Sequence, residues 1–79
     1  MPTAERIDWM LAMLNAAEVG SLDSISAKIR QVEEALVEQG EAALAVAAGD
    51  AARALVRGDV AEFRRGRAFL QSKIGHLRD

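Results

Sequence analysis

The chain has 79 residues, no cysteine, one histidine and a net charge of −2, which predicts one small domain, residues 1–79, without a disulfide or a thiolate metal site. Its apolar fraction of 51% contains much alanine and only three aromatic residues, a composition typical of closely packed helices. No uncharged run reaches the ~18 residues of a membrane span, and charges interrupt the first eight positions, so we expect a cytoplasmic protein without a membrane segment.

The first predicted helix covers residues 4–19. Thr3 is placed to accept a hydrogen bond from an early backbone N–H, and Gly20 suits the left-handed conformation that ends many helices. Ser21 follows as the cap of the next helix, with Asp23 in its first turn. The connection is short, which predicts that the first two helices are antiparallel neighbours.

The end of the second predicted helix is the hardest feature to place. Its apolar stripe is regular through Leu36, but Leu44 is eight residues further on, a phase change that rotates the stripe by ~100°. Helix–helix connections normally take ~2–8 residues, and the sequence around Gly40 offers barely one. We therefore favour one long helix over residues 22–57, bent near Gly40. The alternatives are a break at Gly49-Asp50 and a reversal at Gly40, which would give a four-helix up-down bundle.

A second Gly-Asp pair marks the start of the last predicted helix, residues 60–77. Asp59 with Glu62 three residues later is a variant of the capping box. The predicted fold class is all-α, an antiparallel coiled-coil-like hairpin or three-helix arrangement in which the outer helices each cover half of the long one. Each half would be open on one side, so we expect a homo-oligomer, with a dimer favoured, to complete the core.

Two apolar stripes with alternating steps of three and four residues support this packing. Such steps keep side chains on one face, because a helix turns once per ~3.6 residues. The two stripes most economically bury each other in an antiparallel hairpin. They form the predicted core seam, which consists of Leu22, Ile25, Ile29, Val32, Leu36, Val60, Phe63, Leu70, Ile74 and Leu77.

Three residues depart from the seam and are candidates for a specific role. Arg67 stands where an apolar residue is expected, which predicts either a guanidinium that reaches solvent along its stem or a partly buried ion pair that specifies register. Its candidate partners are Glu38, Glu41 and Asp50. Trp9 and Phe69 fall away from the stripe, so either a neighbouring helix covers them or they form a second interface.

Charge is unevenly distributed along the chain. Residues 1–50 carry nine acidic and three basic side chains, a net charge of −6, whereas residues 51–79 carry seven basic and three acidic side chains, a net charge of +4. The basic half is a solvated face, a complement to the acidic half or a candidate patch for nucleic acid. The candidate patch consists of Arg53, Arg57, Arg64 and Arg65, extended by Lys73 and Arg78.

No motif for chemistry is present. Glu34, Glu38 and Glu41 share a helical face but lack the Glu-x-x-His pair of di-metal bundles, so we expect no metal, no cofactor, no catalytic residue and no small-molecule ligand. The predicted function is a non-enzymatic protein–protein interaction module, a small adaptor, assembly or regulatory subunit acting through apolar helix faces. The alternative is a nucleic-acid-binding accessory protein that uses the basic C-terminal half.

Overall fold

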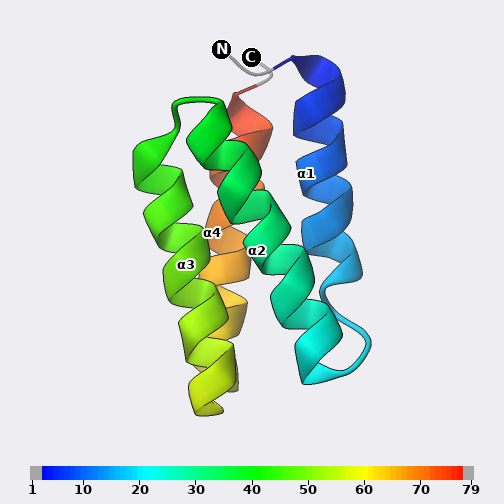
Figure 1. Cartoon of the computed structure of the whole chain (residues 1–79), viewed down its shortest axis with the longest axis vertical. Coiled ribbons are helices and arrows are strands. Elements are labelled where there is room, and N and C mark those ends of the chain that lie inside the picture. Colours follow the sequence, from blue (N-terminus) through cyan, green and yellow to red (C-terminus); the bar gives the residue numbers. More distant parts are fainter. Residues whose placement is uncertain (1–2, 78–79) are drawn as a thin grey trace.

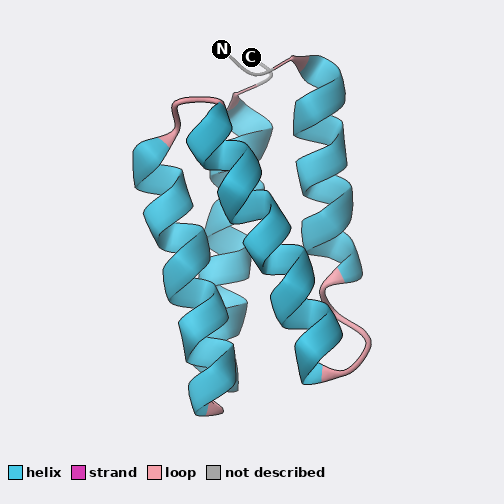
Figure 2. Ribbon diagram, viewed as in Figure 1, coloured by secondary structure: helices cyan, strands magenta, loops and turns pink. Residues whose placement is uncertain are grey.

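The computed structural model describes residues 3–77, which form four helices joined by short connections (Figures 1 and 2). The predicted all-α class is confirmed, and neighbouring helices run antiparallel. Loops of five, three and two residues join the helices. The helices are α1 (Ala4–Ala16), α2 (Leu22–Glu38), α3 (Ala42–Arg57) and α4 (Val60–His76).

Three of the four helices begin with the side-chain cap that the sequence predicts. Thr3, Ser21 and Asp59 each accept a hydrogen bond at 3.1 Å from the backbone N–H three residues later. Each bond satisfies one of the N–H groups that has no partner inside the first turn. α3 begins without a side-chain cap, because the Glu41 side chain before it makes no capping hydrogen bond.

The predicted long helix over residues 22–57 is wrong, because the chain reverses at Gly40. Gly40 has a φ of 77°, its N–H donates to the Val37 carbonyl at 3.1 Å, and the N–H of Glu41 donates to the Leu36 carbonyl at 2.8 Å. This pair of bonds is a Schellman motif, which closes a helix end within its own last turn. Three residues are therefore enough for the connection, and the phase change beyond Leu36 reflects a new helix with its own buried face.

The alternative break at Gly49-Asp50 does not occur either. Gly49 is buried inside α3, and a Cβ atom at this position would lie 2.7 Å from the Glu33 carboxylate of α2. The glycine therefore makes room for a side chain of the neighbouring helix. It does not end its own helix.

The four helices form a ring in which α1 contacts α2 and α4, and α3 contacts α2 and α4 (Figure 1). Across the diagonals, no Cα atoms of the described helices come within 8 Å. The two predicted stripes belong to α2 and α4, so they lie across the core from each other. Because helix direction alternates around the ring, these two helices run parallel, and the predicted antiparallel hairpin of the two stripes is wrong.

The core is closed within one chain. Its fully buried large side chains come from α1, α2 and α4, whereas the buried face of α3 carries five alanines, Gly49 and Leu55. Small side chains let helices approach closely, and a Cβ atom at Gly66 of α4 would lie only 3.0 Å from the Ala51 Cβ. The largest fully buried side chains are Ile7, Met10, Leu14, Ile29, Val32, Leu36, Leu70 and Ile74.

The bundle measures 33 × 21 × 18 Å, and its longest helices have 17 residues. A helix needs ~20 predominantly apolar residues to cross a bilayer. Within residues 3–77, no helix is long and apolar enough to do so.

Gly40→Ala is expected to destabilise the protein by about 1–2 kcal/mol, the cost of a left-handed conformation for a residue with a Cβ atom. Chemical denaturation measures this change in the free energy of unfolding as a shift of the midpoint at an unchanged m-value. Gly75→Ala is the matched control: Gly75 lies in α4 without positive φ, and a Cβ atom there meets nothing within 4 Å. The control is expected to be neutral or stabilising by up to about 1 kcal/mol. Equal effects of the two substitutions would contradict the assignment of the turn.

Gly66→Ala is expected to destabilise the protein by about 1 kcal/mol although alanine favours helix. The added methyl group meets Ala51 at 3.0 Å, and that neighbour is attached directly to the backbone of α3. The same denaturation measurement applies, again with Gly75→Ala as the control in the same helix. A Gly66→Ala variant as stable as the control would show that α3 and α4 separate without cost.

Candidate functional site

One end of the bundle collects exposed apolar side chains from all four helix ends. Alternating helix directions bring together the end of α1, the start of α2, the end of α3 and the start of α4 (Figure 1). Four of the seven exposed large hydrophobic residues within the described part lie here, each 45–74% exposed. We call this the apolar end, and it is defined by Val19, Leu22, Val56 and Val60.

A hollow of about 360 Å³ lies in the apolar end. Ile25, Leu55 and Phe63 of the core line it, and each keeps 5–8% exposure. Apolar side chains thus form most of this concave surface, and the rest of the chain leaves it exposed to water. The complete lining is Ala17, Glu18, Val19, Ile25, Leu55, Val60, Phe63, Arg64 and Arg67.

Arg67 connects α4 to the end of α1 at the edge of this hollow. Its Nη2 donates to Glu18 Oε1 at 2.6 Å, and its Nη1 donates to the Leu14 carbonyl at 3.3 Å. The guanidinium therefore lies at the C-terminal end of α1, where the helix dipole favours a cation. The side chain is 15% exposed, and its Nε is buried without a hydrogen-bond partner in the described residues.

The ion pair predicted for Arg67 is present, but the structure places none of the expected partners there. Arg67 faces α1, whereas the expected Glu38, Glu41 and Asp50 lie on α2 and α3 or on the connection between them. The difference has a geometric cause: α4 contacts both α1 and α3, and residue spacing alone does not say which neighbour a side chain meets. Of the ion pairs described, only this one and Arg6–Glu38 join segments that are far apart in the sequence.

The residues of the predicted core seam differ in how far they are buried. Ile25, Ile29, Val32 and Leu36 of α2 are buried, as are Phe63, Leu70 and Ile74 of α4. Leu77 is partly buried against the core. Leu22 and Val60 are exposed instead, because each is the first residue of its helix and extends beyond the core.

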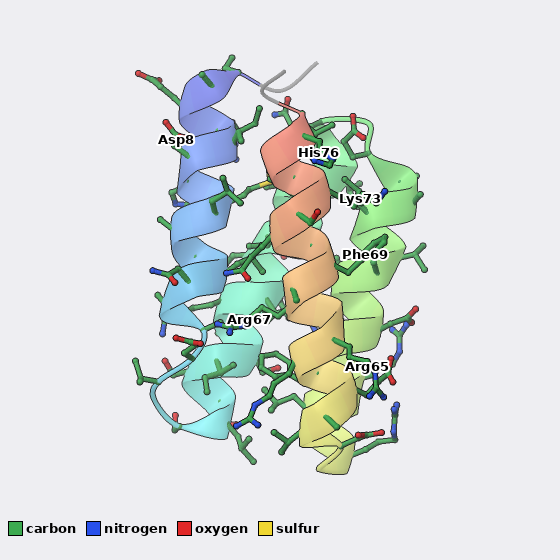
Figure 3. All side chains as sticks on the ribbon, turned by 180° about the vertical axis from the view of Figure 1, so that it is seen from behind. Asp8, Arg65, Arg67, Phe69, Lys73 and His76 are labelled. Atoms are coloured by element: carbon green, nitrogen blue, oxygen red, sulfur yellow. The ribbon has the colours of Figure 1, made fainter. Side chains whose placement is uncertain are left out.

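Trp9 lies on α1, whereas Phe69 lies on the α3 side of α4. Trp9 of α1 is partly buried against the core, with the Arg6 guanidinium 4.9 Å from its ring. Phe69 of α4 is 46% exposed, with Lys73 at 5.8 Å from its ring. Phe69 lines a second hollow of about 380 Å³ between α3 and α4. Figure 3 shows Arg67 on the α1 side of α4, whereas Phe69 and Arg65 lie on its α3 side.

The candidate basic patch is largely paired with its own acidic neighbours. Arg53 pairs with Asp50, Arg57 with Asp59 at 3.9 Å, and Arg65 with Glu62 at 2.7 Å. The hydrogen bond with Glu62, followed by the charge of that carboxylate, raises the pKa of Arg65 above its ordinary value. Arg64 differs, because its side chain has no ion pair or hydrogen bond within residues 3–77 and lines the apolar hollow. Arg78 lies outside the described residues.

Glu34, Glu38 and Glu41 do not share one helical face as predicted, because α2 ends at Glu38 and Glu41 lies in the connection to α3. Glu38 pairs with Arg6 at 3.5 Å. In the part of the chain that the structure describes, no group of three or more histidine, cysteine or acidic side chains has an arrangement that holds a metal ion.

Sequence reasoning missed the apolar end as a site. Val19 and Val56 belong to no stripe, and their only signal is an apolar residue beside a helix end. That signal becomes informative once the reversal at Gly40 is known, because only then do four helix ends meet. Comparisons of the sequence with protein-family models, with curated proteins and with solved structures find no match.

Arg67→Leu is expected to raise the thermal midpoint by several degrees, about 1 kcal/mol for a domain of this size. The substitution removes the buried unpartnered Nε, while the Leu14 carbonyl keeps the Ala17 N–H at 3.2 Å and Glu18 stays hydrated at 59% exposure. Arg67→Ala is the control and is expected to lower the midpoint, because it also removes the packing of the stem. A lower midpoint for Arg67→Leu would show that the ion pair outweighs the cost of burying it.

Proposed function

We propose that this chain is a non-enzymatic protein–protein interaction module, a small adaptor, assembly or regulatory subunit, that binds its partner through the apolar end. The observation that carries the proposal is the clustering of four exposed large hydrophobic residues around a hollow at one end of the bundle. Large apolar patches on a protein surface commonly mark interaction sites. The proposal involves no cofactor.

Burial of the core narrows where such a partner can bind. Apart from Ile25 and Phe63, which line the hollow, the large core side chains of α2 and α4 are 0% exposed within one chain, so a partner cannot reach them without unfolding the bundle. The apolar end supplies what those faces lack: a concave apolar surface that a side chain of another protein can enter. Interface energies concentrate in such pockets, where a few anchor residues lose contact with water.

The charge pattern favours a protein partner over nucleic acid. Phosphate binding needs several cations that face one surface without compensation. Three of the four arginines of the candidate patch are paired with neighbouring carboxylates, and Arg64, the fourth, lines the apolar hollow. A chain of net charge −2 with this pairing has little uncompensated positive surface.

Site-specific photo-crosslinking in the native host tests the proposal, because it captures whichever protein occupies the surface. Benzoylphenylalanine replaces Val60 at the apolar end in one variant and Val46, an exposed valine on α3, in the control. We expect a discrete protein adduct from position 60, since its side chain is buried in the complex, and little adduct from position 46. Absence of an adduct at position 60, or equal yields at both positions, would contradict the proposed surface.

A further inference from the structure

The opposite end of the bundle carries an exposed valine among carboxylates. Val37 in the last turn of α2 is 63% exposed. Glu34 precedes it by three residues on the same helical face, Glu38 follows it, and Glu41 lies in the connection to α3. We call this the acidic end, and it is defined by Glu34, Val37, Glu38 and Glu41.

Two of these carboxylates have unsatisfied charge. Glu38 pairs with Arg6, but neither Glu34 nor Glu41 makes an ion pair or a side-chain hydrogen bond with any described residue. Glu41 precedes α3 without capping it. The acidic end therefore presents an apolar side chain beside two carboxylates that are free to pair with a cationic side chain of another molecule.

The apolar end has the complementary arrangement. Its hollow is apolar, and Arg64 at its edge has no partner within the described chain. Glu18, the one carboxylate in the lining, is already engaged by Arg67 at 2.6 Å. An apolar side chain flanked by carboxylates would thus bury its methyl groups in the hollow and place a negative charge at Arg64.

We propose that the occupant of the hollow is a second copy of this chain, docked head to tail, with Val37 of one copy in the hollow of the next and Glu34 or Glu41 near Arg64. The inference deepens the proposed function by naming the partner, and it rests on that function.

The position of the two surfaces determines the form of the assembly. They lie at opposite ends of a bundle 33 Å long, as Figure 1 shows for the α2–α3 connection and the α1–α2 loop. Docked end to end, a pair of molecules makes only one of the two contacts, so each docked pair leaves one free end of each kind. Such a contact is heterologous and adds further copies unless the rotation closes a ring.

Light scattering of the purified full chain over a series of concentrations tests the inference. At low salt we expect the weight-average mass to rise steadily above the monomer mass of 8.5 kDa and beyond twice that value. Added salt is expected to weaken the association, since it screens the exposed charges. A mass that stays at the monomer value, or that stops at a dimer, would overturn the head-to-tail contact.

Charge reversal identifies the two surfaces. Arg64→Glu and Glu34→Lys are each expected to weaken self-association by about tenfold or more, because each places like charges in contact. Mixing the two variants is expected to restore the association, since each then meets its opposite charge. Arg65→Glu is the control: Arg65 is a neighbour of Arg64 that lies on the α3 side, paired with Glu62, and its reversal is expected to leave association unchanged.

Two further outcomes separate this inference from the proposed function. Failure of the mixture to recover, with all variants folded by circular dichroism, would overturn the pairing of Arg64 with the acidic end. A monomeric wild-type protein that still gives an adduct at position 60 in the host, with a mass other than two copies, would reject the second copy as occupant and retain the interaction module. A monomeric wild-type protein that gives no adduct at position 60 would reject both the second copy as occupant and the interaction module.

Discussion

At Gly40 the last carbonyls of α2 bond to the two amides that follow, and this closed turn sends α3 back along α2. Everything else in the fold depends on this reversal. A straight or bent continuation would have left two open layers that need another chain to cover them. The turn places a fourth helix in the ring and lets one chain bury its own apolar faces.

The composition of α3 makes the short turn compatible with a packed core. Three residues hold two helices close together, and large side chains between them would force the axes apart. Alanines and Gly49 occupy that face, so α3 lies close to both α2 and α4. The largest fully buried side chains come from the other three helices. Small residues thus concentrate in the helix that is most tightly surrounded.

Helix caps were predictable from the sequence because each depends on atoms within one turn: the Ser21 hydroxyl meets an amide three residues later whatever packs around it. Helix pairing was predictable only across a short connection, as for α1 and α2. An apolar stripe identifies the inward face of a helix but not the helix that covers it, so α2 and α4 were expected to be neighbours and Arg67 was assigned to the wrong partner. The hollow was beyond local reasoning, because four helix ends contribute to it.

α1 is held differently from the other helices. It stays farther from its neighbours than α3 does, and the longest connection of the fold follows it. Since Ala17, Glu18 and Val19 form one wall of the hollow, a detached α1 would abolish that wall. In the proposed complex, binding at the hollow would be coupled to the docking of α1, and an occupant would slow hydrogen exchange along a helix that it touches only at its end.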